Sequence, residues 1–415
     1  MYCPPEILSA IMWYLPKVEL KKARLVCKAF DAAAVPFLFD EIFIIPRYAN
    51  IEKATLLASR FGPFVKTLIY CSEDFDGGIG RAVFKCITAD TDLAADYYAS
   101  FCKLQEEKKE LLSGGEFFGH LCCVLIAIYN LQTIILTDEC RTTQGFCWCQ
   151  QGYSDAHSRT FNPRPDEDYP ALKSLKSAPG HKCIKSFYLG LHHPMKNTWP
   201  DLLRALFTSG NTKVKTILTV ESYSSSCLDI SNFCMTPRQR FCATQILPNL
   251  TSLDLHLCVH DDDSESLFWE GIVAPTLSAA INLELLRIGL VNNDVVWDKE
   301  DYFNLIVGGC KMPKLVTFGL SYFTFTEEGM TNFLRNSQRI RHMSLEYAGL
   351  RSGSWENLFQ TVKNTMSLES FKSRRFYGAG LDGMGYRSDP AIQRFLFGDG
   401  PNPFSRAALK DTAAE

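Results

Sequence analysis

Leu250-Thr251-Ser252-Leu253-Asp254-Leu255 is the stretch of sequence that decides the fold. Its last three residues alternate, so Leu253 and Leu255 face one side of a strand and Asp254 faces the other. The chain returns to this phrase of three apolar residues at the first, fourth and sixth positions. Close copies begin at Leu131, Ile184, Leu283, Leu315 and Ile340, and looser copies begin at Val65, Val214 and Leu368. Each copy predicts one half-buried strand.

Helical stretches separate the strand phrases. They are predicted at 117–130, 201–208, 301–307, 327–335 and 355–362. Alternation of strands and helices predicts an α/β solenoid, with parallel strands on one face and helices on the other. The phrase resembles the strand segment of a leucine-rich repeat. Because the phrase starts from 184 onward are 30, 36, 33, 32, 25 and 28 residues apart, the expected repeat is degenerate.

The phrase is interrupted between 137 and 183, where Pro, Gly, Asp and Ser predominate. This composition predicts a long exposed loop. The loop contains zinc-binding residue types, although their spacing is irregular for a zinc site: Cys140, Cys147, Cys149 and His157.

Aligned strands would place their outward side chains in a ladder on the concave face of the solenoid. Neither sign of charge dominates the middle position of this ladder, which reads Ile135, Tyr188, Leu218, Asp254, Arg287, Gly319, Ser344 and Lys372. A mixed face suits a protein partner better than a nucleic acid, which requires Lys and Arg throughout. The candidates for substrate binding are Tyr188, Asp254, His256, Arg287, Glu346, Lys372 and Arg374. The alternative is a ladder that is merely solvated.

The first forty-five residues predict three short helices. Pro4 and Pro5 begin a helix whose apolar stripe ends at Pro16, and a second helix is expected over 18–28. Lys17, Lys21, Lys22 and Arg24 are expected on its solvated side. A third segment, 30–39, is interrupted by Pro36. Since a unit of this size buries little surface alone, a partner or another domain must cover its apolar residues.

These residues resemble the F-box family. The resemblance rests on Pro4-Pro5-Glu6-Ile7-Leu8, on Ile11 and Leu15, on Arg24-Leu25-Val26-Cys27-Lys28-Ala29-Phe30, and on Pro36-Phe37-Leu38-Phe39. The chain departs from the family pattern at Cys3, where Leu is usual, and at Pro16-Lys17, which offers no Ser or Asp cap.

The F-box resemblance implies docking on a Skp-type adaptor and, through it, on the cullin and RING subunits of an SCF-type ubiquitin ligase. The residues that it assigns to the adaptor interface are Pro4, Ile7, Leu8, Ile11, Leu15, Leu25, Val26, Cys27 and Phe30. The alternative is that these residues only pack against the next domain as a cap on the solenoid.

The expected organisation is an F-box at 1–45, a leucine-rich-repeat-like solenoid at 46–377 and a Gly/Pro-rich tail with a short helix at 378–415. The function expected from the resemblance, in the manner of fungal F-box proteins, is that of a substrate-recognition subunit holding a protein substrate. It would be no enzyme and would need no cofactor. A scaffold protein without a ubiquitin ligase role is the alternative.

Composition fits this organisation. The 415 residues carry 43 Lys+Arg and 46 Asp+Glu, a net charge of -3, which argues against a nucleic-acid partner. The 16 cysteines are scattered without a C-x-x-C pair, which indicates a reducing compartment, the cytoplasm or the nucleus. The N-terminus does not have the basic segment followed by an apolar segment that is typical of a secretory signal, so no such signal is expected. The longest apolar run has eight residues, whereas a membrane span needs about 20, so no membrane partner is expected.

Two other patterns point weakly to enzymes. Gly378-Ala379-Gly380-Leu381-Asp382-Gly383 matches a dinucleotide fingerprint, but no helix is predicted directly after it. Asp254, His256, Cys258 and His260 alternate along one strand, and a transition metal could bind there. A metalloenzyme using His256 and His260 is therefore a distant alternative.

Overall fold

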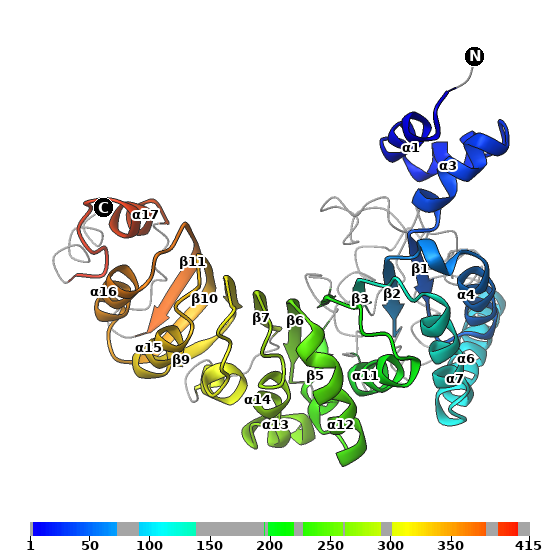
Figure 1. Cartoon of the computed structure of the whole chain (residues 1–415). Helices are drawn as coiled ribbons and strands as arrows, with labels where there is room; N and C mark the ends of the chain where they lie inside the picture. The colour runs from blue at the N-terminus through cyan, green and yellow to red at the C-terminus, as the bar shows by residue number, and fades with distance from the viewer. Residues whose placement is uncertain are drawn as a thin grey trace. The chain divides into compact units, whose positions relative to one another are not determined.

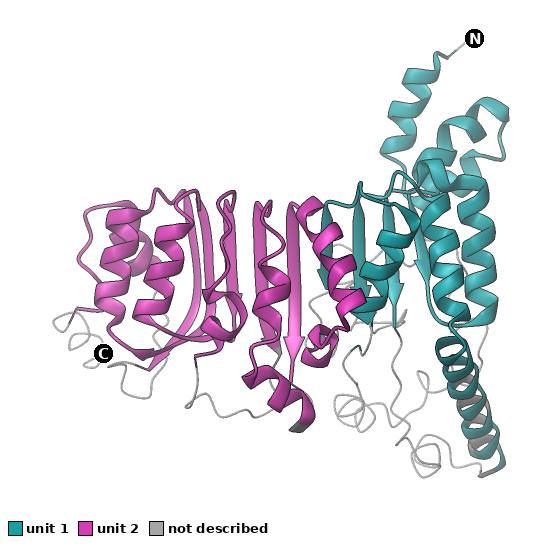
Figure 2. Cartoon of the chain, turned by 60° about the horizontal axis from the view of Figure 1, so that its bottom comes forward, with its two compact units in different colours: residues 1–227 teal, residues 228–415 magenta. Residues whose placement is uncertain are grey.

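The computed structural model describes residues 3–72, 91–137, 195, 198–219, 227–259, 262–291, 301–378 and 389–405. The chain folds as two compact units, residues 1–227 and residues 228–415 (Figures 1 and 2). This division falls inside the segment 46–377 for which a solenoid is expected from the sequence. The loop expected at 137–183, with its cysteines, lies outside the described residues apart from Thr137.

Unit 1 begins with three helices, α1 (Pro5–Trp13), α2 (Lys17–Ala23) and α3 (Lys28–Leu38). The second helix is shorter than predicted, because residues 24–27 form a turn in which the Val26 amide donates to the Ala23 carbonyl. The third helix continues through Pro36. The ring nitrogen of Pro36 cannot donate to the carbonyl of residue 32, so the last turn of this helix has one backbone hydrogen bond fewer.

A parallel sheet follows in unit 1, in the order β1-β2-β3-β4. Its strands are β1 (Glu41–Ile44), β2 (Thr67–Cys71), β3 (Thr133–Thr137) and β4 (Thr216–Thr219). The connections contain α4 (Tyr48–Phe61), the 3-10 turn η1 (Gly62–Phe64), α6 (Thr91–Ser113), α7 (Glu116–Ala127) and α11 (Thr198–Ser209). Helices α4, α7 and α11 pack in sequence beside one another.

Unit 2 repeats this arrangement with a parallel sheet in the order β6-β7-β8-β10-β11, where β5 also pairs with β6 and β9 with β10. The strands are β5 (Leu228–Asp229), β6 (Ser252–Cys258), β7 (Leu285–Val291), β8 (Thr317–Ser321), β9 (Thr324–Thr326), β10 (His342–Ser352) and β11 (Ser370–Gly378).

The helical elements of unit 2 lie between these strands and after the last of them. They are η3 (Ile230–Phe233), α12 (Pro237–Ile246), η4 (Leu247–Asn249), α13 (Asp262–Trp269), α14 (Val273–Leu277), η5 (Asn304–Gly308), α15 (Glu327–Asn336), α16 (Trp355–Thr365) and α17 (Asp389–Phe397). The helix predicted at 301–307 is a short π-helix, η5. The short helix expected in the tail is α17.

The strand phrases confirm the expected α/β class with parallel strands. Every phrase within the described residues contains or leads into a strand, and its apolar residues are buried, as Leu250, Leu253 and Leu255 are, except for the half-buried Leu368. In unit 2 these residues pack against aromatic side chains of the helices. The rings of Phe318 on β8 and Phe333 on α15, for example, have centroids 4.8 Å apart. Each unit is therefore solenoid-like, with helices along one side of its sheet (Figure 2).

Polar caps fix where the helices of unit 2 begin. The Thr326 hydroxyl accepts from the Gly329 amide at the start of α15, and the Ser354 hydroxyl accepts from the Glu356 amide at the start of α16. At the other end of the chain, Phe404 stacks on Phe359 with ring centroids 4.9 Å apart. This contact closes the last repeat, whose apolar interior would otherwise meet water.

Within the described residues, no single helix has both the length and the apolar composition to cross a membrane. One pair, Gln105–Ser113 with Glu116–Ala127, meets those two criteria jointly but is bent by 74°.

Candidate interaction surfaces

The three N-terminal helices pack around an apolar core, which α4 also contacts. Met12, Leu20 and Leu38 are fully buried in it, together with Ala34 and Phe39. Leu15 and Phe30 pack against this core as partly buried residues. The helices therefore do not need their remaining apolar side chains in order to fold.

The remaining apolar side chains form what we call the exposed helical patch. It consists of Ile7, Ile11, Trp13, Tyr14, Val18, Leu25 and Val26. Ile7, Ile11 and Tyr14 follow the spacing of one helix face, and they are 53%, 48% and 82% exposed. Leu25 in the turn after α2 is also 82% exposed. Large exposed apolar side chains that lie together on a surface mark a site of interaction.

The structure divides the predicted adaptor residues into two groups. Pro4, Ile7, Ile11, Leu25, Val26 and Cys27 are exposed. By contrast, Leu8 is buried, and Leu15 and Phe30 pack on the core of the helices. Two aromatic residues, Trp13 and Tyr14, belong to the patch although the prediction did not include them.

Lys17 lies inside the protein, so the expectation that it is solvated is wrong. Its side chain is 8% exposed, and its Nζ pairs with Asp40 and with Glu41, at 3.1 Å from Glu41 Oε2. No side chain caps α2, whose N-cap is Pro16. The ammonium at the first position of α2 instead connects this helix to the residues that begin β1.

The N-terminal helices are also joined to α4 by apolar contacts. The rings of Phe39 and Phe61 stack with centroids 3.7 Å apart and an interplanar angle of 5°. Leu57 and Phe61 of α4 pack on the same core as Met12 and Leu38. The helices are thus built into the first repeat of unit 1.

A second surface is the open face of the unit 2 sheet, on the side opposite its helices. Strand pairing places Asp254, Arg287, Gly319, Ser344 and Lys372 in one row across five strands. A second row contains His256, Gly289, Ser321, Glu346 and Arg374. The predicted alignment of these residues is confirmed. Tyr188, the remaining candidate, lies outside the described residues.

Charged side chains of β6 and β7 interact on this face. Arg287 Nη1 lies 3.7 Å from Asp254 Oδ2, and His256 Nε2 lies 4.0 Å from Asp254 Oδ1. Arg287 also crosses Gly319, because a Cβ atom there would come within 3.0 Å of Arg287 Cγ. Glycine on β8 therefore leaves room for an arginine that reaches from the neighbouring strand.

Burial governs the protonation of His256. Desolvation lowers the pKa of its imidazole below the ordinary histidine value, and the nearby Asp254 carboxylate opposes this effect only in part. The side chain is close to Gly289, where a Cβ would lie 3.0 Å from His256 Cδ2. The imidazole of His256 is therefore neutral at pH 7.

Metal-binding chemistry receives no support at this strand. Cys258 is buried, and His260 is outside the described residues. Within the described ranges, no three His, Cys, Asp or Glu side chains come together as a metal site would require. The glycine pattern at 378–383 lies almost wholly outside these ranges.

The corresponding face of unit 1 is apolar and buried. Phe43, Ile69 and Ile135 form a buried cluster there, and Leu218 packs against it. Strand pairing places Ile135 beside Ile69 and Leu218. The two apolar ladder members expected from the sequence are thus packed residues, and the open polar face belongs to unit 2.

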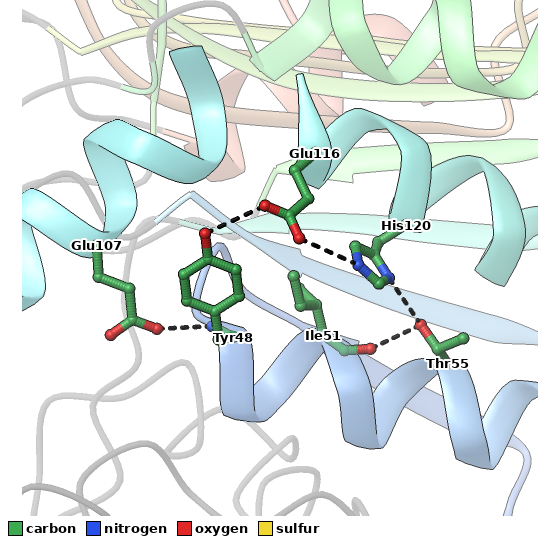
Figure 3. Close-up of polar contacts among 6 residues, drawn as sticks. All are labelled: Tyr48, Ile51, Thr55, Glu107, Glu116 and His120. Carbon is green, nitrogen blue, oxygen red and sulfur yellow. Dashed lines mark hydrogen bonds and ion pairs between the residues drawn. The ribbon is translucent and has the colours of Figure 1, made fainter. Parts of the chain in front are cut away.

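A polar cluster on the helices of unit 1 was not predicted (Figure 3). The Tyr48 hydroxyl donates to Glu116 Oε2 over 3.1 Å, and this bond is the main reason that the pKa of Tyr48 is raised. His120 Nε2 lies 4.0 Å from Glu116, and its Nδ1 lies 3.5 Å from Thr55 Oγ1.

A catalytic triad consists of a nucleophile, a base and a carboxylate that orients the base, and the contacts here follow that order in Thr55, His120 and Glu116. The Thr55 hydroxyl, however, donates to the Ile51 carbonyl over 2.7 Å, and the contacts of His120 exceed the 2.6–3.2 Å typical of proton transfer. The cluster joins α4 to α7, and the Tyr48 amide donates to Glu107 of α6. Its geometry supports a structural role.

Comparison with known proteins places the chain in no family. No family model and no curated protein matches its sequence. One solved structure that it resembles is the complex of Rad7 and Elc1 in yeast, with a TM-score of 0.29 and 12% identity over 96% of this chain and 86% of that chain. A similarity this weak carries no functional information.

Proposed function

We propose that the chain is an F-box protein with degenerate leucine-rich repeats. It would act as the substrate-recognition subunit of an SCF-type ubiquitin ligase. In this role the exposed helical patch binds a Skp-type adaptor, which connects the chain to cullin and RING subunits. The chain itself performs no chemistry, and it accelerates ubiquitin transfer by holding a protein substrate near the charged enzyme.

One observation carries this proposal: the N-terminal helices expose seven large apolar side chains although the core that they pack around is already filled. Ile7, Ile11, Leu25 and Val26 are among them, at positions where the sequence resembles the F-box. A fully buried aliphatic side chain contributes about 1.5–3 kcal/mol. In protein interfaces a few such anchors carry most of the binding energy.

The open face of unit 2 supports the second half of the proposal. It presents side chains of both signs on a rigid sheet, including Asp254, Arg287, Glu346 and Lys372. Charges of both signs on one surface select a protein partner with a complementary charge pattern and fix its register. On this proposal, the cytoplasm or the nucleus is where the chain meets its partners.

The adaptor prediction is tested with residues that are exposed, so that the fold is preserved. Ile7→Asp together with Ile11→Asp should weaken binding to a purified fungal Skp-type adaptor at least 100-fold, about 2.7 kcal/mol. Titration calorimetry on the full-length chain measures this affinity. Ile281→Asp is the matched control, because Ile281 is 50% exposed in unit 2, and it should leave the affinity unchanged.

Unchanged adaptor affinity in the double variant would disprove the proposed docking surface. Absence of binding by the unmodified chain would favour the alternative, a scaffold protein without a ligase role. Removal of residues 1–45 does not separate these functions, because it also deletes β1 and uncovers Leu57 and Phe61. Point substitutions on the patch avoid that ambiguity.

A further inference from the structure

Three residues at one level of the unit 2 sheet have a left-handed backbone. They are Tyr322, Tyr347 and Arg375, with φ angles of 61°, 53° and 58°, and within the described residues no other non-glycine residue has a positive φ. Because Glu346 pairs with both Ser321 and Arg374, the three residues follow the second row of the open face on adjacent strands. The Tyr322 amide donates to the Glu346 carbonyl over 2.8 Å, which fixes this backbone.

Tyrosine and arginine have a higher conformational energy than glycine in the left-handed backbone conformation that these three residues adopt. A left-handed residue redirects the strand, and glycine or asparagine would achieve this with less strain. The chain instead has two tyrosines and an arginine, which are the residue types most enriched at the energetic centres of protein interfaces. Strain of this kind is commonly retained where side chains must be presented to a ligand.

Their side chains gather into what we call the Tyr–Arg cluster: Tyr322, Tyr347, Arg374 and Arg375. The two tyrosine rings stack, with centroids 4.4 Å apart and an interplanar angle of 5°. The guanidinium carbons of Arg374 and Arg375 lie 5.1 and 5.6 Å from the centroid of the Tyr347 ring. Tyr322 is 39% exposed and Arg374 is also exposed, so the cluster is accessible.

The cluster carries positive charge, and no carboxylate among the described residues pairs with it. In the part of the chain that the structure describes, neither arginine forms an ion pair, and the exposed Lys372 on the same strand forms none. Glu346 is the cross-strand neighbour of Arg374 in the strand register. A guanidinium that contacts a ring through its face keeps its N–H donors available for a carboxylate.

We propose that the Tyr–Arg cluster anchors an acidic peptide segment of a protein partner. Carboxylates of Asp or Glu would bind Arg374 and Arg375, and an apolar side chain of the same segment would lie on the exposed tyrosine. Asp254 and Glu346 on the open face disfavour a polyanion such as nucleic acid, which interacts with cations along its whole length. This inference rests on the proposed function, since the segment would belong to the ubiquitin ligase substrate.

A peptide pair tests the charge requirement on the unmodified full-length chain. The probe is a fluorescein-labelled peptide with four Glu and one Phe among Gly and Ser, and its counterpart has Gln at each Glu position. Fluorescence anisotropy should show at least tenfold tighter binding of the Glu peptide, and the difference should shrink as salt is raised. Equal affinities for the two peptides would overturn the proposal, whatever the behaviour of the variants.

Substitutions then locate the site. Arg374→Gln with Arg375→Gln should weaken binding of the Glu peptide at least tenfold. The matched control, Arg335→Gln with Arg339→Gln, removes the same charge from exposed positions at and after the end of α15 and should change nothing. Equal affinity of the Arg374/Arg375 variant and the unmodified chain would contradict the assigned site.

Tyr322→Asn separates recognition from a purely structural role. Asparagine tolerates the left-handed backbone, so peptide binding should fall while the unfolding temperature does not. A lower unfolding temperature with unchanged peptide binding would show that the row serves the fold alone. Adaptor affinity is measured on the same samples: its loss with peptide binding intact contradicts only the proposed function, and the reverse result contradicts only this inference.

Discussion

Lys17 shows how one residue defines the junction between the N-terminal helices and the sheet. Its position in a run with Lys21 and Lys22 favoured a solvated side chain, yet its ammonium lies between Asp40 and Glu41. A cation that is almost fully buried is retained only when it is paired. Sequence spacing alone does not reveal this pairing, because its partners follow more than 20 residues later.

Replacement of this cation should destabilise unit 1. We expect Lys17→Met to reduce the free energy of unfolding by about 1–3 kcal/mol, because Asp40 and Glu41 lose a charged donor while their partial exposure allows water to replace it. Urea unfolding followed by circular dichroism measures the change. Lys22→Met is the control: its pair with Glu19 is exposed, and its loss should cost about 0.5 kcal/mol or less. Equal effects of the two substitutions would contradict the role of Lys17.

His256 should make stability depend on pH. Burial lowers its pKa in the folded state, so below the ordinary histidine pKa of about 6.5 the unfolded chain binds a proton more readily than the folded chain. The contribution of His256 to the free energy of unfolding is therefore fully present above that pH. It is lost as the pH falls toward the pKa of His256 in the folded state. Between pH 7 and pH 5, urea unfolding should show a smaller decrease in stability for His256→Gln than for the unmodified chain. Parallel pH profiles would contradict this assignment.

At the scale of elements, the strand phrase was a reliable predictor and helix boundaries were less so. The phrases at Leu250, Leu283 and Leu315 lead into strands because alternation buries two apolar residues of each phrase. The second N-terminal helix was predicted over 18–28 from its periodicity, but it ends at Ala23, and the apolar Leu25 and Val26 lie in a turn. Because Leu25 and Val26 continue the helical spacing of apolar residues, the sequence alone does not show that they lie in a turn.

Elements without the phrase were missed. Strand β1 (Glu41–Ile44) and helix α4 (Tyr48–Phe61) lie in a segment to which no repeat was assigned. Both are held by tertiary contacts: β1 pairs with β2 along four residues, and Phe61 stacks on Phe39. Local propensity is a weak predictor of such elements, because burial against neighbours decides whether they form.

At the scale of the whole molecule, the N-terminal helices and the first repeat should unfold together. A chain that lacks residues 1–45 loses the first strand of the unit 1 sheet and exposes Phe61 and Leu57. We expect it to lose the cooperative unfolding of unit 1 and to aggregate, as followed by circular dichroism and light scattering. The Ile7→Asp and Ile11→Asp double variant is the control, since both side chains are exposed and its melting curve should match that of the full chain. A folded, monomeric truncated chain would show that the helices are an independent module.

The sequence by itself determined the α/β class, the parallel strands, the alignment of the ladder from Asp254 to Lys372, and the presence of three N-terminal helices. Those features follow from local periodicity, which fixes the side of an element on which each residue lies. Only the tertiary structure decided that Leu8 is buried while Tyr14 is exposed, that Lys17 is paired, and that Tyr322, Tyr347 and Arg375 align. These properties depend on which distant segments pack together, and no local pattern carries that information.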